Sequence, residues 1–277
     1  MWWSTTARFD DQTREAERID VEYRELLMRF QECYGWRITD TSDLRSGEFT
    51  TINGAELHAP ETGLGELWHI KAVGLPLDFA PPGAGETGPE IARRAADAGA
   101  FIGIVHPSWY GLTHADARTI DVAHAVEIYN HGSHIELDRG TDWPFLDGLL
   151  NAGWRLSGYA SDDAHFWIDD CFGGWVWVQA DHLEPAALLD SLKQGRYYSS
   201  QGPVLHNVEV RDGTVEVECS PARNVAITGR GAKSETVRGN GLTHCELPVR
   251  RFQGSWFRIT VIDAAGRRAW TNPVWLD

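Results

Sequence analysis

The pattern of expected secondary structure changes near residue 200, and this change limits the possible folds. Before it, short runs rich in valine and isoleucine alternate with runs of helical periodicity. This alternation is typical of α/β folds built on a parallel sheet. After residues 201–204, only short alternating strands separated by Gly, Asn and Asp turns follow. We therefore expect an α/β domain over residues 1–203 and a small all-β, sandwich-like domain over residues 204–277.

The α/β part is expected to contain six or seven strands and four helices. The expected strands cover 36–40, 49–60, 68–77, 101–107, 125–130, 155–163 and 173–180, and the expected helices cover 13–33, 87–100, 142–154 and 184–198. The short connections favour a barrel over an open sheet. The loop 59–67 is too short for a crossover helix, so the strands on either side of it should pair antiparallel.

Composition narrows the classes of partner. The formal net charge is −15, which disfavours a nucleic-acid backbone as the main partner because such binding depends on Lys and Arg. The chain has no apolar run long enough to cross a membrane and no secretory signal at its start, so the cytoplasm is the default expectation. A small-molecule substrate fits best, and the oligomeric state stays open.

Side chains of the metal-ligating type gather at the expected strand ends. Strands close on or just before Asp40, Glu56, His106, Asn130, Asp163 and His165. In parallel α/β folds the carboxyl ends of the strands carry the functional residues. His69 opens its strand instead, but an antiparallel hairpin would bring it to the same edge as Glu56. Carboxylates and imidazoles together suit Zn²⁺, Mn²⁺ or Fe²⁺.

Each of these residues also has a purely structural interpretation. His106 could be a hydrogen-bonded histidine at a strand end, and Asp163 and His165 could cap a turn. Their joint occurrence at one expected edge is what favours a metal site. His131 follows Asn130 and is a candidate for substrate contact, while the orientation of His58 stays open.

Four motifs resemble the PHP (polymerase and histidinol phosphatase) family of metallohydrolases. They are HPSWYGLT (106–113), VEIYN (126–130), SDDAH (161–165) and GRYYSSQGP (195–203). The sequence is most similar to the carbaryl-hydrolase-like CehA/McbA branch, and the likeness extends into the tail at 263–277. The resemblance implies a distorted (β/α)₇ barrel with up to three metals at its rim.

Carried over residue by residue, the resemblance implies a reduced metal site. The family's ligands fall on Glu56, His69, His106, Asp163 and His165. Trp2, Ser4 and Thr41 stand where the family has histidines, and Asp10 or Asp11 is a candidate extra ligand. We therefore expect one or two ions in place of three.

The resemblance implies a metal-dependent hydrolase of a small ester that uses a metal-activated water. The ester is a phosphoester by family majority, and a carboxyl ester or carbamate by the nearer branch. Asp163 or His165 would act as general acid or base. Residues expected near the substrate are Asp40, Asn130, His131, Trp109 and Tyr110. Two alternatives remain: a non-catalytic relative that binds a metal or metabolite, and an enzyme with one metal and non-hydrolytic chemistry.

Overall fold

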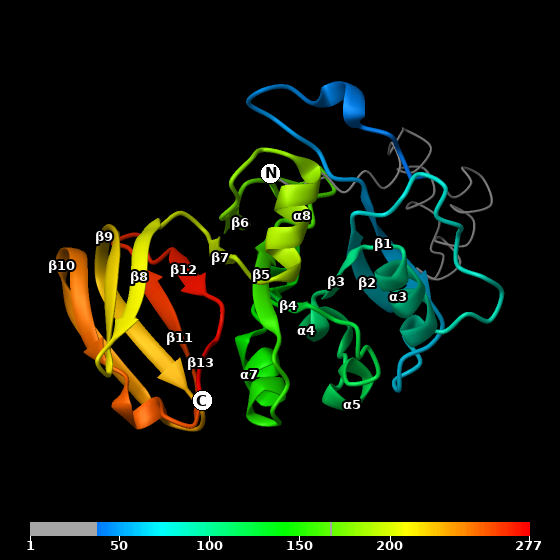
Figure 1. The fold of residues 1–277 in the computed structure, drawn as a ribbon. Coiled ribbons are helices and arrows are strands. Elements are labelled where there is room, and N and C mark those ends of the chain that lie inside the picture. Colours follow the sequence, from blue (N-terminus) through cyan, green and yellow to red (C-terminus); the bar gives the residue numbers. More distant parts are fainter. Residues whose placement is uncertain (1–37, 167) are drawn as a thin grey trace.

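The computed structural model describes residues 38–166 and 168–277, which form two sheets (Figure 1). The first sheet has the strand order β1-β2-β3-β4-β5. The second has the order β10-β9-β11-β12-β7-β6, with β8 on β9 and β13 on β11. The expected helix 13–33 lies outside the described residues, and residues 38–40 of the expected strand 36–40 are not in a strand.

The elements of the first part follow the alternation of the sequence. The strands are β1 (Gly54–Ala59), β2 (Trp68–Val73), β3 (Phe101–Ile104), β4 (Ala125–Asn130), β5 (Ser157–Ser161), β6 (Trp175–Val178) and β7 (Tyr197–Ser200). The helices are η1 (Ser42–Leu44), α3 (Gly88–Asp97), α4 (Pro107–Tyr110), α5 (His114–Ala117), α6 (His131–Leu137), α7 (Trp143–Asn151) and α8 (Pro185–Lys193).

The expected (β/α)₇ barrel is wrong. Over the described residues the first sheet is open, with β1 and β5 at its edges. Its β1–β2 and β2–β3 pairs are antiparallel, and only β3–β4 and β4–β5 are parallel. Strands β6 and β7 are not part of this sheet. They belong to the second one, where β7 pairs with β12.

The antiparallel β2–β3 pair shows why the alternation misled. The start of α3 at Gly88 lies against the Trp68 ring at the start of β2. The loop 74–87 therefore runs back along the whole strand before the helix begins. Helix α3 then returns the chain to the end where β2 finished, so Phe101 pairs with Val73. A strand-helix-strand sequence thus gives a parallel pair only if the helix itself carries the chain back to the start of the first strand. Here the loop 74–87 does so, and the pair is antiparallel.

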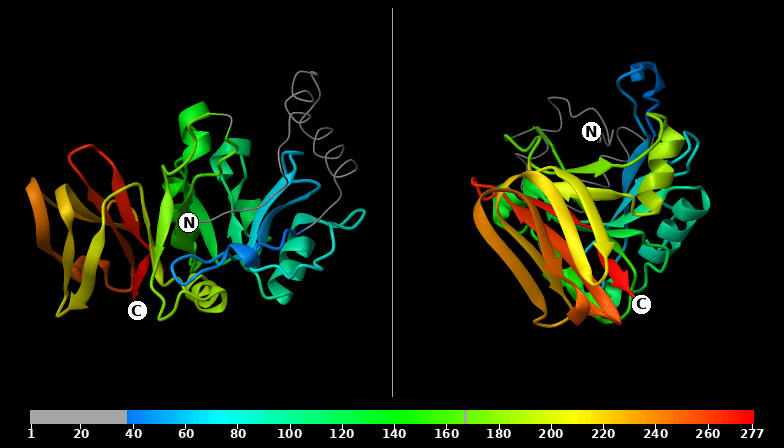
Figure 2. Two further views of the ribbon diagram at one scale, coloured as in Figure 1. Left: turned by 90° about the horizontal axis from the view of Figure 1, so that it is seen from above. Right: turned by 60° about the vertical axis from the view of Figure 1, so that its left-hand side comes forward.

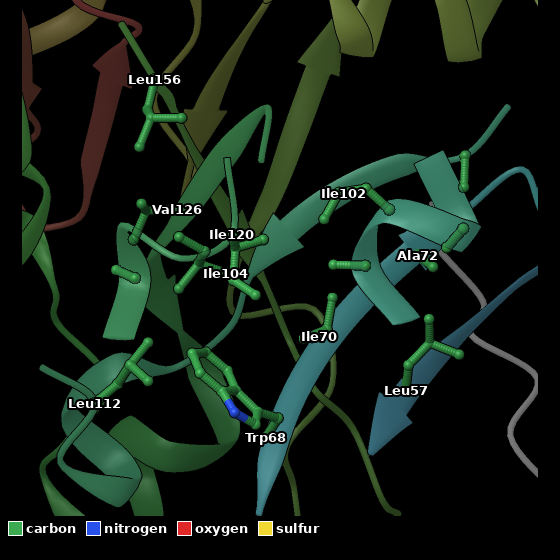
Figure 3. Packing of buried hydrophobic residues seen from close by; sticks show 14 of the residues in the cluster. Leu57, Trp68, Ile70, Ala72, Ile102, Ile104, Leu112, Ile120, Val126 and Leu156 are labelled. Carbon is green, nitrogen blue, oxygen red and sulfur yellow. The ribbon is translucent and has the colours of Figure 1, made fainter. Parts of the chain in front are cut away.

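The first sheet has two different faces. Leu57, Ile70, Ala72 and Ile102 point into a core that lies on the same side as α3 (Figure 3). Helix α7 adds Leu146, Leu149 and Leu150 to that core. Side chains of a strand point to opposite faces in turn, so Glu56 and His58 of β1 and His69 and Lys71 of β2 lie on the other face. This second face carries the candidate site.

The C-terminal part is built almost entirely of strands. These are β8 (Leu205–Arg211), β9 (Thr214–Gly229), β10 (Ser234–Pro248), β11 (Ser255–Ile262), β12 (Arg268–Thr271) and β13 (Val274–Leu276), with the short helix η2 (Arg250–Phe252). They enclose a second core that includes Val217, Ile227, Phe252 and Phe257. This part lies at one end of the molecule, and β1, β2 and α3 lie at the other (Figure 2). Because β6 and β7 share its sheet, the domain boundary at residue 203 stays a prediction.

Within 38–166 and 168–277, no helix combines the length and apolar character that crossing a bilayer requires.

Candidate metal centre

The strand directions bring the ligand-type residues together along one edge of the first sheet, the edge formed by the ends of its strands. Strand β1 ends where β2 begins, and His58 pairs with His69 across this hairpin. Because β3 is antiparallel to β2, its carboxyl end reaches the same edge, where His106 follows. Strands β4 and β5 run parallel to β3, so Asn130 and Asp163 arrive there too. The side chains that were expected to meet at the rim of a barrel therefore meet at one edge of an open sheet.

At this edge one carboxylate oxygen contacts three imidazoles. Glu56 Oε1 lies 2.5 Å from His69 Nδ1, 3.4 Å from His58 Nε2 and 3.4 Å from His106 Nε2. His58 Nε2 is 3.2 Å from His69 Nδ1. The donor atoms of Glu56, His58 and His69 lie within 4.8 Å of one another, so this group could hold a metal ion.

The donor set of Glu56, His58 and His69 fits a metal. Two imidazoles and a carboxylate are a donor set that borderline divalent ions prefer. The identity and number of the ions do not follow from these observations.

The protonation states of Glu56 and His69 suit metal binding. Burial opposes ionisation of Glu56, but hydrogen bonds from His106, His58 and His69 outweigh it and hold the pKa of the carboxyl well below its usual value. Burial lowers the pKa of His69 to about 4, against the opposing effect of Glu56. At neutral pH the carboxylate is therefore charged and the imidazole neutral, which are the forms that ligate metals.

His106 behaves differently from His69. Burial tends to lower its pKa, but the hydrogen bond and charge of Glu56 dominate, and the charges of Asp163 and Glu127 add to them. The pKa of His106 is thereby raised to about 9. The imidazolium balances the surrounding carboxylates, so a cation bound here would compete with its proton.

Asp163 lies beside the group, held by an amide. Its Oδ2 accepts a hydrogen bond from Asn130 Nδ2 at 3.1 Å and is 3.9 Å from His106 Nε2. Asp163 has a backbone φ of 53°, in the left-handed region, where aspartate is tolerated better than most residues. Its side chain is partly exposed. Its carboxylate can therefore reach both a bound ligand and His106.

Other expected site residues lie elsewhere. The His165 side chain is exposed, and its backbone N–H donates to Asp170 Oδ2. The His131 Nδ1 is 2.9 Å from the Tyr129 hydroxyl, away from Glu56. Asp40 is exposed and accepts from the Ser42 N–H in a turn. The structure thus brings none of these three into the Glu56 group, and Asp10 and Asp11 lie outside the described residues.

Trp109 and Tyr110 support the imidazoles. The Trp109 ring centroid is 5.4 Å from that of His69 and 5.2 Å from that of His106. Tyr110 lies at 5.3 Å and 5.6 Å from the same two rings. Both residues come from α4, directly after His106. They fix the orientation of the histidines and line no part of the cavity described next.

A cavity of about 500 Å³ opens beside the group. One end is polar, with Glu56, Asp163, Lys71 and Ser161. The remaining lining is mostly apolar and includes the aromatic side chains of Phe101, Tyr159, Phe166, Phe172, Trp175 and Trp177. Lys71 is the only basic side chain among the described residues that line it. A site with charged groups at one end and a broad apolar wall is the usual form of a small-molecule site.

The sequence left the orientation of His58 open and did not reveal the polar neighbours Lys71 and Glu127 as part of the site. A signal for His58 was present, because it is two residues after Glu56 in a strand whose intervening Leu57 is buried. Side chains two apart on a strand share a face. Lys71 and Glu127 could have been found in the same way only with the strand pairing known.

No protein-family model matches the chain, and neither the curated proteins nor the solved structures give a match.

Proposed function

We propose that this protein is a metal-dependent hydrolase of small organic esters. The observation that carries the proposal is the Glu56 carboxylate in contact with three imidazoles at the polar end of a cavity. Glu56, His58 and His69 would hold one ion, with His106 beside them. Zn²⁺, Mn²⁺ and Fe²⁺ are the candidates, since each accepts mixed nitrogen and oxygen ligands. The resemblance of the sequence to PHP metallohydrolases points the same way.

When bound, such an ion lowers the pKa of water toward neutrality and polarises the scissile group. The remaining work falls to residues of the chain. Asp163 is placed to accept a proton, because it lines the cavity and its Oδ2 is held by Asn130 at 3.1 Å.

The walls of the cavity favour a neutral ester with an apolar group over a phosphoester. Phosphate recognition in proteins usually involves several Arg or Lys side chains. Lys71 is the one basic side chain on the described lining, and its Nζ already donates to Ser161 Oγ at 2.8 Å. Phe101, Tyr159 and Trp175 can instead bury the apolar part of a carboxyl ester or carbamate.

The test is hydrolysis of three chromogenic probes by protein reconstituted with Zn²⁺ or Mn²⁺. The probes are 4-nitrophenyl acetate, its N-methylcarbamate counterpart and 4-nitrophenyl phosphate. We expect metal-dependent turnover of the acetate or carbamate. Asp163→Asn should lose this turnover while keeping its metal, whereas Asp169→Asn, an exposed neighbour in the same loop, should keep both.

Turnover of the phosphate alone would overturn the proposed substrate class. A protein that holds its ion firmly but hydrolyses none of the three probes would overturn the proposal of an ester hydrolase and favour the binding alternative.

A further inference from the structure

A fully enclosed carboxylate lies behind the metal centre, on the middle of β4. The Glu127 side chain is 1% exposed and does not line the cavity. Its Oε2 accepts from the His106 backbone N–H at 2.8 Å and from Asn130 Nδ2 at 3.0 Å. Its Oε1 accepts from Ser161 Oγ and is 3.4 Å from Lys71 Nζ. Four donors from four different segments therefore meet on one carboxylate.

The contact with His106 holds an unfavourable backbone conformation. His106 has φ 25° and ψ 55°, and Pro107 follows it. Non-glycine residues in sparsely populated regions are strained and persist only where their surroundings enforce them. The hydrogen bond from the His106 N–H to Glu127 Oε2 is such a constraint. This backbone conformation places His106 Nε2 3.4 Å from Glu56 Oε1.

The contact with Asn130 extends the same control to Asp163. Asn130 Oδ1 accepts from the Ser133 N–H at 2.8 Å, which fixes which end of the amide is the oxygen. Its Nδ2 then donates both to Glu127 Oε2 at 3.0 Å and to Asp163 Oδ2 at 3.1 Å. The Asn130 amide, held by Glu127, thus holds the Asp163 carboxylate in place in turn.

We infer that Glu127 is a positioning residue of the metal centre. It acts through His106 and Asn130, and it touches neither the ion group nor the substrate cavity. The role of Glu127 as a positioning residue rests on the proposed function, whereas the contacts of Glu127 do not depend on it. The competing interpretation is a buried ion pair, in which Glu127 serves only to neutralise Lys71.

Two substitutions separate these roles. Glu127→Gln keeps an oxygen within reach of the His106 N–H and Asn130 Nδ2 but loses the charge. Glu127→Asp keeps the charge but withdraws it by one methylene from both donors. Positioning predicts that the aspartate variant is the worse of the two, whereas charge neutralisation predicts the reverse. Glu136, exposed on α6, provides the matched controls Glu136→Asp and Glu136→Gln.

The readouts are the Kd for Zn²⁺ by competition with a chelating dye, and the ¹⁵N chemical shifts of the His106 imidazole. Loss of an outer partner of a metal ligand typically weakens binding about 10- to 100-fold, and Glu127 acts one contact further out, through His106 and Asn130. We expect Glu127→Asp to raise the Kd about tenfold, the lower end of that range, and to shift the His106 signals. The Kd of Glu127→Gln should stay within about threefold of the wild-type Kd, which is well below that range.

The inference is wrong if Glu127→Gln weakens binding as much as Glu127→Asp, or if neither variant changes the Kd. A wild-type protein that binds no Zn²⁺ would count against the proposed function. In that case the His106 signals alone decide the inference, which is overturned if Glu127→Asp leaves them unchanged.

Discussion

At the scale of single residues, the centre depends on one carboxylate whose surroundings keep it charged. Three imidazoles within 3.4 Å of Glu56 Oε1 more than offset the cost of burying the charge, so the pKa of Glu56 is held low. The buried His69 stays neutral because its own pKa falls to about 4. The site therefore offers ligands in their metal-binding forms at neutral pH.

The first prediction concerns His58, the candidate ligand that strand ends alone do not reveal. His58→Ala should raise the Kd for Zn²⁺ by more than about tenfold, since loss of even an outer partner of a ligand has that effect. His182→Ala, exposed in the loop before α8, is the control and should bind as wild type does. Isothermal titration calorimetry measures both. Equal Kd values for the two variants would remove His58 from the site.

The second prediction is a pH dependence of stability from Asp142. This residue is buried, and burial raises its pKa to about 6 despite the hydrogen bonds from Ser108. The folded state therefore binds a proton more tightly than the unfolded state, whose pKa is near 3.8. Ionisation of Asp142 should thus lower the free energy of unfolding as pH rises from about 4 to about 7, by up to about 3 kcal/mol.

Asp142→Asn removes this titration. Its free energy of unfolding in urea, relative to that of wild type, should rise between pH 4.5 and pH 7.5. A buried amide could cost some stability, but that cost does not vary with pH. Parallel stability profiles for the two proteins over this range would contradict a raised pKa for Asp142.

Single positions also show what a sequence can reveal about a site. His69, His106 and Asp163 could be found because each lies at the start of a strand or shortly after one, and Glu56, which lies inside β1, because a strand end was expected there. His58 required the period-two alternation to be followed along β1. Glu127 could not be found, because a carboxylate in an apolar strand has no visible partner until His106 and Asn130 are folded against it.

At the scale of elements, α3 lies close against the sheet because it begins with a glycine. Glu90 accepts from the N–H and hydroxyl of Thr87, which fixes the start of the helix. A Cβ on Gly88 would stand 2.3 Å from Cγ of the buried Trp68 ring. The contact sets the return path from β2 to β3, and through it the edge on which His106 lies.

The third prediction tests this contact. Gly88→Ala should lower the free energy of unfolding by about 1–3 kcal/mol, the usual cost of overpacking a core. Gly47→Ala is the control, because a Cβ there meets no atom within 4 Å. Its change should stay within about 0.5 kcal/mol. Urea denaturation of the three proteins gives the comparison, and an unaffected Gly88→Ala would mean that α3 can move away from Trp68 at no cost.

Element positions were more predictable than their pairing. The capping pattern and periodicity placed α3 within a few residues, and the short loop 59–67 predicted the antiparallel β1–β2 hairpin. The direction of β3 could not be predicted, because it depends on whether the chain returns through the loop 74–87 or through the helix. The set of elements was itself only partly right, because residues 38–40 of the expected strand 36–40 are not in a strand and β7 begins within the expected helix 184–198.

At the scale of the whole molecule, partly buried hydrogen bonds and an ion pair join the C-terminal strands to the first part of the chain. Asn272 Oδ1 accepts from the Gly158 N–H at 2.9 Å, and its Nδ2 donates to the carbonyls of Gly195 and Tyr197. Arg258 on β11 contacts both carboxylate oxygens of Asp147 on α7 at 3.1 Å. The C-terminal strands therefore support β5, the strand that leads to Asp163.

The fourth prediction follows from Asn272. Asn272→Ala leaves three backbone groups without their partner and should lower the free energy of unfolding by about 1–3 kcal/mol. Asn207→Ala, exposed on β8, should be close to neutral. Differential scanning calorimetry can follow both. An unchanged Tm for Asn272→Ala would show that the two sheets do not depend on this junction.

The central claim is that Glu56 and its histidines form a metal site. The most direct measurement is elemental analysis of the full chain after Zn²⁺ or Mn²⁺ reconstitution and gel filtration. The account predicts that wild type and the exposed control Glu48→Gln retain an ion, and that Glu56→Gln, which keeps the shape but not the charge, does not. A wild-type chain without metal, or a Glu56→Gln variant with the same content, would contradict it.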